Sequence, residues 1–389
     1  MAPELPDDWT KRPLRRMAER IRRGLAGEPE HILMITSTAG WLPQSEKYNR
    51  FMAGESLKNY VELHEGEFSY NKGNSKTYPQ GCVYQLEGWD RAAVPNVYIS
   101  FALDGRQIDH GYASQFFAAG GLNRQLRRVI TSTARSNGLL NIAIDDFFGC
   151  EVILPPLPEQ RTIAAILSSV DDAIAATRNV IEQTERVKQG LLQTLMTRGI
   201  GHTRFKETEV GEVPEEWEVV RVGGLFERLR VPRTLDGSSR VEGGETPILD
   251  QSGSDWFGYH SGEADLRASS AEPLITFANH TCAVRFMTEP FSVIQNVFPL
   301  RALDDVDPRF LYWVMQQAVR QDGYRGHWPE VKRSAFPKPP YSEQVEIAER
   351  IDAAERSAGS AQGVLAHLQT LKRGLLQDLL TGRVRVQPD

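Results

Sequence analysis

The sequence predicts an α+β protein in which two mixed α/β modules form a pseudo-two-fold repeat and are separated by two long antiparallel coiled-coil helices. Three observations lead to this class. The chain contains an internal repeat, part of each copy carries a heptad pattern, and the rest carries short strand-like runs. The 389 residues are 40% hydrophobic and 25% charged, which is the composition of a folded protein with two or three domains.

The repeat is strongest where each copy has a pair of prolines. The run from Leu154 to Ala164 recurs from Lys338 to Ala348, and the run from Lys188 to Leu195 recurs from Lys372 to Leu379, both 184 positions later. Weaker matches, such as Pro6-Asp-Asp-Trp9 with Pro214-Glu-Glu-Trp217, precede it at offsets that fall from 208 to 198. A gapless match indicates a rigid element, since insertions concentrate in loops. We therefore predict four segments, residues 1–153, 154–199, 200–336 and 337–384.

The two gapless segments have the pattern of long helices. Apolar residues alternate in steps of four and three, which is a coiled-coil seam. A start at Pro158 or Ser342 and a stop at Gly199 or Gly382 bound helices of about 58 Å each, longer than one ~34 Å turn of duplex DNA. We expect the two copies to pack antiparallel. The seam residues are Ile163, Leu167, Ile174, Ile181, Leu191, Leu195, Ile347, Ile351, Leu365, Leu375 and Leu379.

The seam is imperfect for a tight two-stranded coil. It also contains Thr177, Thr184, Lys188 and Lys372. Two interpretations stay open: the helices form a self-sufficient spacer, or helices of another protein complete the packing at the seam.

The remaining segments predict mixed modules. Strand-like runs bounded by Gly, Pro and Asn occur at 83–86, 97–103, 274–277 and 291–297. Each module also has one helical stretch near its end, at 112–117 and 309–319. These signals predict a sheet and a covering helix in each module.

Charge is uneven along the modules. The net charge of −6 taken alone argues against nucleic acid, but residues 11–23 hold seven basic residues and one acid, and residues 221–240 hold five arginines. Such stripes are typical of phosphate contact, although a solvated face remains the alternative. Two further stripes supply candidate DNA-binding residues: Arg124, Arg127, Arg128 and Arg135 in the first module, and Arg325, His327, Lys332 and Arg333 in the second.

One segment of the first module is rich in amides, hydroxyls and lysines without acids. Its candidate DNA-binding residues are Tyr70, Asn71, Lys72, Asn74, Ser75 and Lys76, and the counterparts in the second module are Asn279, His280 and Arg285. Asparagine pairs with adenine and lysine with guanine in standard base-edge contacts. Either segment is equally explained as an ordinary turn at the end of a strand.

Catalytic signatures are missing. No GxxxxGK[ST], HExxH or GxSxG pattern occurs, nor any motif of an amino-methyltransferase, so we expect no catalytic and no metal-binding residue. Cys82, Cys150 and Cys282 are far apart and form no CxxC, which fits a reducing cytoplasm. The polar start, residues 1–9, is unlike a signal peptide, and no apolar run is long enough for a membrane span. A binding and scaffolding protein is the expectation.

The combined motifs resemble those of specificity subunits of type I restriction-modification systems. The resemblance rests on Pro-Pro-Leu-Pro-Glu-Gln-Arg-x-Ile-Ala at 155–164, on Lys-Gln-Gly-Leu-Leu-Gln-x-Leu-Met-Thr at 188–197, on the two Pro-x-x-Trp starts and on Phe-Ser-Val-Ile-Gln-Asn-Val at 291–297. It implies two target recognition domains, each reading one half of an asymmetric DNA site. It also implies that two methyltransferase subunits and restriction/translocase subunits assemble on the helices. S-adenosylmethionine, ATP and Mg are then expected on those partners only.

Two other classes remain to be compared with this one. A coiled-coil scaffold with two modules for ligands other than nucleic acid predicts no salt-dependent binding of duplex DNA. A standalone methyltransferase or nuclease is disfavoured by the missing motifs, and activity of the isolated chain would support it.

Overall fold

The structure is a computed structural model that describes residues 5–36, 40–47, 55–73, 78–130, 139–252, 256–318, 323 and 325–387. Its contacts divide the chain into two compact units. Unit 1 comprises Met1–Thr177 with Val364–Asp389, and unit 2 comprises Arg178–Gly363. The division falls inside both long helices, so each unit contains one module together with a part of each helix. The four predicted segments follow the order of the chain, whereas each compact unit combines one module segment with parts of both helix segments.

Unit 1 is built mainly from short strands in its module. The strands are β1 (Thr10–Pro13), β2 (Ala18–Arg20), β3 (Leu33–Thr36), β4 (Gly40–Pro43), β5 (Val61–His64), β6 (Phe68–Asn71), β7 (Cys82–Gln85), β8 (Arg91–Val94), β9 (Ile99–Leu103) and β10 (Glu151–Leu154). The helices are α1 (Gln44–Lys47), α2 (His110–Ala118), α3 (Asn123–Val129) and α4 (Ile144–Gly149), with short 3-10 helices at Leu14–Arg16 and Glu55–Asn59.

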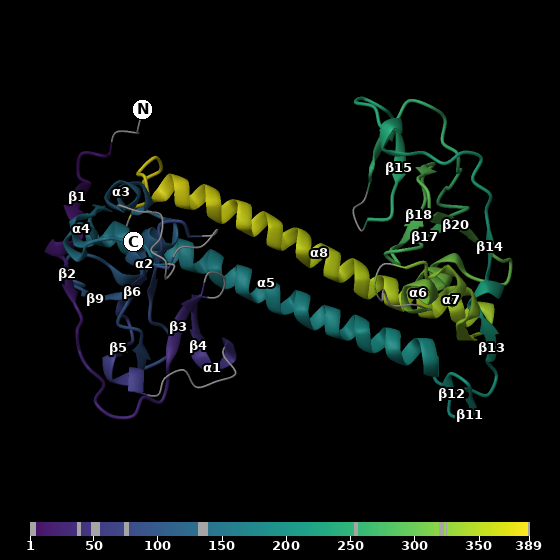
Figure 1. Ribbon diagram of the computed structural model, residues 1–389, viewed down its shortest axis with the longest axis horizontal. Coiled ribbons are helices and arrows are strands. Elements are labelled where there is room, and N and C mark those ends of the chain that lie inside the picture. Colours follow the sequence, from purple (N-terminus) through teal and green to yellow (C-terminus); the bar gives the residue numbers. More distant parts are fainter. Residues whose placement is uncertain are drawn as a thin grey trace. The chain divides into compact units, whose positions relative to one another are not determined.

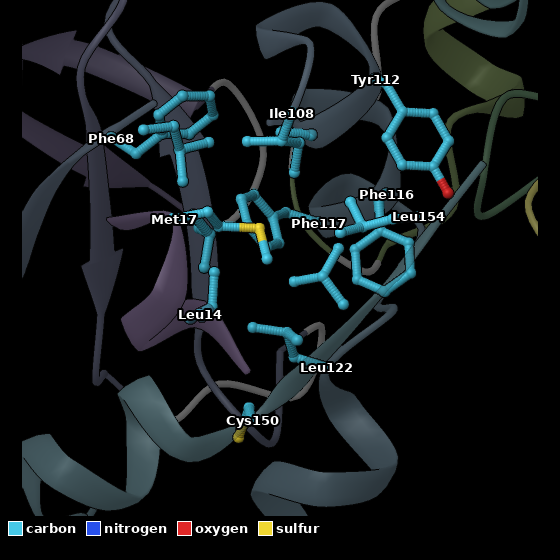
Figure 2. Packing of buried hydrophobic residues seen from close by; sticks show 14 of the residues in the cluster. Leu14, Met17, Phe68, Ile108, Tyr112, Phe116, Phe117, Leu122, Cys150 and Leu154 are labelled. Atoms are coloured by element: carbon cyan, nitrogen blue, oxygen red, sulfur yellow. The ribbon is translucent and has the colours of Figure 1, made fainter. Parts of the chain in front are cut away.

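The central sheet of unit 1 has the strand order β2-β9-β6-β7, and every neighbouring pair in it is antiparallel. Side chains alternate between the faces of a strand, so Phe68 and Tyr70 on β6 both enter the core. Figure 2 shows this core, in which Phe68, Ile108 and Phe117 pack with residues from the start of the module. The expected helix at 112–117 is present as α2.

Unit 2 repeats the plan with its own elements. Its strands are β11 (Phe205–Thr208), β12 (Gly211–Pro214), β13 (Glu218–Arg221), β14 (Phe226–Arg228), β15 (Thr246–Leu249), β16 (Gly258–His260), β17 (Leu274–Ala278), β18 (Val284–Met287), β19 (Ser292–Val293), β20 (Val297–Ala302) and β21 (Ala335–Lys338). Its helices are α6 (Pro308–Ala318) and α7 (Trp328–Arg333), with 3-10 helices at Val222–Gly224 and Gly237–Ser239.

The central sheet of unit 2 has the order β14-β20-β17-β18, which matches unit 1 strand for strand. The register matches too: β6 pairs Phe68 with Phe101, and β17 pairs Ile275 with Leu300 at the equivalent position. In each unit the strand that follows the Pro-x-x-Trp motif also pairs with the strand that leads into a long helix, β1 with β10 and β13 with β21. The repeat predicted from sequence thus extends through the modules, and the α+β class is confirmed.

The long helices are α5 (Leu157–Arg198, 42 residues) and α8 (Tyr341–Leu379, 39 residues), coloured teal and yellow in Figure 1. In unit 1, Asp171 of α5 pairs with Lys372 of α8 at 2.5 Å, and in unit 2, Lys188 pairs with Glu355 at 2.7 Å. Within each unit the residue numbers rise along α5 as they fall along α8, so the helices are antiparallel. No helix in the described part of the chain has the length and apolar character that a membrane span requires.

A glutamine side chain in the first turn of each long helix forms hydrogen bonds with the adjoining module. Gln160 donates its amide to the carbonyl of Pro155 at 2.9 Å and accepts from the backbone N–H of Asp109 at 2.8 Å. Gln344 makes the same two bonds, to Pro339 at 2.9 Å and from Asp307 at 3.0 Å. Each aspartate in turn caps the following module helix, α2 or α6, by accepting backbone N–H groups.

A hydrogen-bonded carboxylate lies in the first turn of each long helix, buried in the case of Glu159 and half-buried in the case of Glu343. In unit 1, Glu159 accepts hydrogen bonds from the indole of Trp9 at 3.1 Å and from Arg385 at 2.8 Å. In unit 2, Glu343 accepts from the indole of Trp217 and from the backbone N–H of Ile200, both at 2.9 Å, and lies 2.9 Å from the ring of His202. These bonds satisfy the carboxylates where burial alone would be costly.

The helix stop predicted at Gly199 is confirmed, because α5 ends at Arg198, whereas α8 ends at Leu379, three residues before Gly382. Gly199 and Gly382 have φ of +65° and +74°, a left-handed conformation that strains other residues. A Cβ on Gly199 would also lie 2.6 Å from the ring of Trp217. The glycine therefore lets the chain leave α5 while passing close to the core of unit 2.

Candidate nucleic-acid interface

Two of the predicted DNA-binding side chains lie in the cores, and these predictions are wrong. Tyr70 is fully buried, stacks on Phe147 with 4.6 Å between ring centroids, and donates its hydroxyl to the carbonyl of Gln80. His327 is also fully buried, at the start of α7. A side chain without exposed surface cannot reach a base edge in this conformation, so both residues support the fold instead.

Two of the predicted polar residues of unit 1, Asn71 and Lys72, lie in the described structure at the end of β6. Asn71 accepts the backbone N–H of Gly73 at 2.9 Å and donates to the carbonyl of Ile35 at 3.2 Å. Lys72 is half-buried, and its backbone carbonyl accepts from Leu140 at 2.9 Å. The alternative interpretation as a strand-end turn therefore describes Asn71. Asn74, Ser75, Lys76 and Arg135 lie outside the described residues.

The counterparts in unit 2 are also engaged by their own chain. Asn279 accepts the backbone N–H of Trp328 at 2.9 Å, and the ring of His280 lies 3.0 Å from the carbonyl of Arg325. Arg285 donates to the backbone carbonyls of Asp250 and Ser252. These three side chains hold the loops of unit 2 together, which is a structural role that composition does not distinguish from base contact.

An exposed basic face remains on α3 in unit 1. Arg124, Arg127 and Arg128 are exposed, while Leu126 on the opposite side enters the core. The side-chain amide of Gln125 exchanges two hydrogen bonds of 2.8 Å with the backbone of Glu151 and so fixes α3 against β10. Within the described residues, no acid lies within ion-pair distance of these arginines. They form a positive surface on a fixed helix, as phosphate contact requires.

A smaller basic face lies on α7 in unit 2. Lys332 and Arg333 are exposed, and the ammonium of Lys332 lies 5.9 Å from the ring centroid of Trp328. Arg325 forms an ion pair with Glu330 at 2.9 Å, which neutralises part of the stripe. The predicted basic tail of unit 2 thus divides into an exposed pair, a neutralised arginine and a buried histidine.

A groove in unit 2 contains arginines that the sequence analysis placed in a stripe but did not single out. It has a volume of about 480 Å³, and its polar lining includes Arg228, Arg230, Thr234 and Asn296. Its apolar wall includes Phe298 of β20. The signal available in the sequence was the cluster at 221–240. Strand pairing, which brings Arg228 beside β20, was needed to select these residues.

The described cysteines do not have the character of nucleophiles. Burial raises the pKa of Cys82 to about 12 and that of Cys150 to about 11, and burial also raises the pKa of Cys282. All three thiols are free and remain protonated near neutral pH. Within the described residues there is also no cluster of three or more potential metal ligands.

Seven of the predicted seam residues face the chain itself, which is the packing that a self-sufficient spacer requires, and contact of the seam with a partner protein stays a prediction. Ile163, Leu167, Ile174 and Leu379 are buried in unit 1, and Leu195, Ile347 and Ile351 are buried in unit 2. The heptad pattern reports packing of the helices on each other and on the modules. Ile181, Leu191, Leu365 and Leu375 are half-buried, and their role stays a prediction.

Other positions on the long helices expose large apolar side chains. Val180 and Val187 on α5 are 52% and 56% exposed, and Val364 and Leu371 on α8 are 49% and 51% exposed. The two members of each pair are seven residues apart and share a helix face. Val180 corresponds to Val364, and Val187 to Leu371, at the repeat offset of 184. Each unit therefore carries one such patch.

Comparisons with known proteins agree with this architecture. A family model described as the type I restriction modification DNA specificity domain matches residues 116–186. Two relatives are type I restriction enzyme specificity subunits of Methanocaldococcus jannaschii. The provisionally assigned MjaX subunit is 23% identical over 99% of this chain and 95% of its own. The MjaVIII subunit is 24% identical over 66% of this chain and 68% of its own.

Solved structures share the fold. The S subunit of a type I restriction-modification system from M. genitalium aligns with a TM-score of 0.63 at 14% identity, covering 97% of this chain and 99% of that one. A chain from a study of complex assembly in a type I system aligns at 0.52 and 14% identity, covering 98% of this chain and 100% of its own. The chain is thus similar in sequence to type I restriction-modification specificity subunits along most of its length, and it shares the fold of the solved ones.

Proposed function

We propose that this chain is the non-catalytic, DNA-binding specificity subunit of a type I restriction-modification complex in the cytoplasm. Unit 1 reads one half of a bipartite, asymmetric DNA site and unit 2 reads the other. The observation that carries the proposal is the duplication, because two units with the same sheet order differ in the side chains of their loops. Two units with the same sheet order but different loop side chains are suited to reading two different half-sites.

The basic faces supply the affinity in this proposal. The α3 arginines of unit 1 and Lys332 with Arg333 of unit 2 are exposed on short helices that pack on their own unit. Phosphate contacts act locally, so a net charge of −6 for the whole chain does not oppose them. The acidic residues of the long helices account for part of that negative total.

The scaffolding role is supported by the exposed apolar pairs. Val180 with Val187 and Val364 with Leu371 are equivalent under the repeat, so the same surface of one partner fits both pairs. We therefore propose that two methyltransferase subunits dock there and that restriction subunits join the complex. S-adenosylmethionine, ATP and Mg belong to those partners in this proposal.

Selection from a random duplex library tests the reading of DNA. The full-length chain, alone and with its methyltransferase subunits, is expected to enrich a motif of two short half-sites with an unread spacer. A triple Arg124→Ala, Arg127→Ala, Arg128→Ala variant is expected to bind all duplexes more weakly and to show a weaker dependence of affinity on salt. A chain that binds no duplex in either state contradicts the proposal and favours a scaffold for other ligands.

Co-purification tests the docking surface. A Val180→Asp, Val187→Asp variant is expected to retain one methyltransferase subunit, and adding Val364→Asp with Leu371→Asp removes the second. Val241→Asp is the matched control, because Val241 is 45% exposed and lies away from the helices. Retention of both subunits by the fourfold variant would contradict the docking surface and leave the reading of DNA unaffected.

A further inference from the structure

The groove of unit 2 holds a guanidinium in a fixed position. Arg228 is the last residue of β14, and its guanidinium lies 4.0 Å from the ring centroid of Phe298 and 5.7 Å from that of Trp328. Both rings belong to the packed part of unit 2, and Trp328 is buried. A guanidinium stacked on an aromatic ring keeps its N–H donors in the ring-parallel plane, where they remain available to an oxygen ligand.

A second arginine lies on the same side of the chain. Leu229 donates its backbone N–H to the carbonyl of Pro299 at 2.9 Å, which continues the pairing with β20 beyond Arg228. Alternate residues of an extended chain point to one face, so Arg230 follows Arg228 along the groove. Both line it, and no acidic residue does. Asn296, at the turn before β20, also lines the groove in a left-handed conformation with φ +66°.

Unit 1 has two arginines at the equivalent backbone positions. Arg20 is the last residue of β2, and Ile21 donates its backbone N–H to Ser100 of β9 at 2.9 Å, as Leu229 does in unit 2. Arg20 and Arg22 therefore share a face. Burial, and then the like charge of Arg22, lower the pKa of Arg20. Arg23, one residue further, is neutralised by Glu67 at 2.6 Å, but no acid among the described residues pairs with Arg20 or Arg22.

We propose that Arg228 and Arg230 in unit 2, and Arg20 and Arg22 in unit 1, are equivalent anchors for the phosphate backbone of duplex DNA and do not read its bases. This inference rests on the proposed function and specifies part of its site. The pairs occupy the same place in two units that face different half-sites. An element common to both units suits what all half-sites share, which is the backbone. An anion between two like-charged guanidinium groups also relieves their repulsion.

The test measures duplex binding by the full-length chain over a range of salt concentrations. The variants are Arg228→Ala with Arg230→Ala, and Arg20→Ala with Arg22→Ala. Each is expected to reduce the slope of log affinity against log salt by about two, and to weaken binding to every duplex by on the order of 30-fold at physiological salt. The motif enriched from a random duplex library is expected to stay the same. Replacing both residues of a pair by lysine is expected to retain most of the slope.

Matched controls remove the same charge elsewhere. Arg186→Ala with Arg204→Ala deletes two exposed arginines of unit 2 that pair with Glu182 and Glu215 outside the groove, and the salt slope is expected to stay near wild type. The inference is overturned if the groove variants keep the wild-type slope or if the enriched motif changes at one or two positions. If the wild-type chain itself binds no duplex, the proposed function fails and this inference with it.

Discussion

The carboxylates in the first turns of the two long helices, Glu159 in unit 1 and Glu343 in unit 2, are held by different partners. Each accepts the indole N–H of the tryptophan that opens its module. In unit 2 the other partners, Ile200 and His202, come from the segment that follows α5. In unit 1 they are Arg385 and Val386, from the segment that follows α8.

The residues that follow α8 therefore contribute stabilising contacts to unit 1. Arg385 is bidentate to Asp8, at 2.9 and 2.7 Å, while it also binds Glu159, and it lies 5.7 Å from the ring centroid of Trp9. The linker after α5 performs the same task in unit 2. Each unit is thus completed by the segment that leaves the long helix belonging to the other module.

Removing the tryptophan that binds each carboxylate is expected to cause the largest loss of stability, and to do so in one unit at a time. Trp217→Ala should destabilise unit 2 by about 3–5 kcal/mol, because Trp217 is fully buried and its loss leaves a cavity and removes one hydrogen bond from Glu343. Hydrogen exchange read by mass spectrometry should show faster exchange in β13 and β21 and little change in β1 and β10. Trp9→Ala should give the converse pattern. Equal acceleration in both units would show that they do not unfold separately.

Neutralising each carboxylate is expected to destabilise the two units by different amounts, because the partners of the carboxylates differ. Glu159→Gln should destabilise unit 1 by about 2 kcal/mol, since Arg385 loses a charged acceptor, and Glu343→Gln should cost unit 2 about 1 kcal/mol. Hydrogen exchange of the strands next to each helix start measures both. Asp305→Asn, at an exposed ion pair with Lys338, is the control and should change little. A larger loss for Glu343→Gln would reverse the argument.

Exchanging the basic partner is expected to have a smaller effect, and one that depends on pH. Arg385→His should cost unit 1 about 1 kcal/mol near neutral pH, because an imidazole cannot reproduce the bidentate contact. A histidine held by carboxylates stabilises only while protonated. The contribution is complete below its unfolded pKa of about 6.5 and is lost as pH rises through the raised folded value. Thermal unfolding of the variant from pH 6 to 8 should show this loss, and wild type should not.

Acid is expected to give the smallest effect, through the two carboxylates of unit 1 that Arg385 holds. Burial by itself raises the pKa of Glu159, but the hydrogen bonds from Arg385, Trp9 and Val386 outweigh it and hold the pKa below its ordinary value. The bond from Arg385 likewise lowers the pKa of Asp8. Their stabilisation is present above the ordinary carboxyl range and is lost as pH falls through the lowered values. The stability gap between wild type and Arg385→Ala should therefore close at low pH. A gap that stays constant would exclude these carboxylates as its source.

The sequence was sufficient where a pattern is local or repeated. The heptad spacing predicted α5 and α8, and Gly199 marked the end of α5, because a helix records its own period. Tyr70 was misassigned although Phe68 and Tyr70 alternate as core residues of a strand do. Its polar neighbours drew the interpretation toward the surface.

The groove arginines show what local patterns do not contain. Arg228 is distinguished from other arginines of its stripe by the ring of Phe298, which is seventy positions away in the chain and is brought near by pairing of β14 with β20. The exposed pair of Val180 and Val187 was likewise not predictable from sequence. Their exposure can be recognised only once the buried residues of the helix are known.

The paired bonds of Gln160 and Gln344 have a mechanical consequence. Each side-chain amide connects the first turn of a long helix to two points of its module, the carbonyl of the preceding proline and the N–H of the aspartate that caps the module helix. Two hydrogen bonds to separate points of the module restrict rotation of the helix relative to it. If the first turn of α5 or α8 rotates, the attached module is therefore expected to rotate with it as one rigid body.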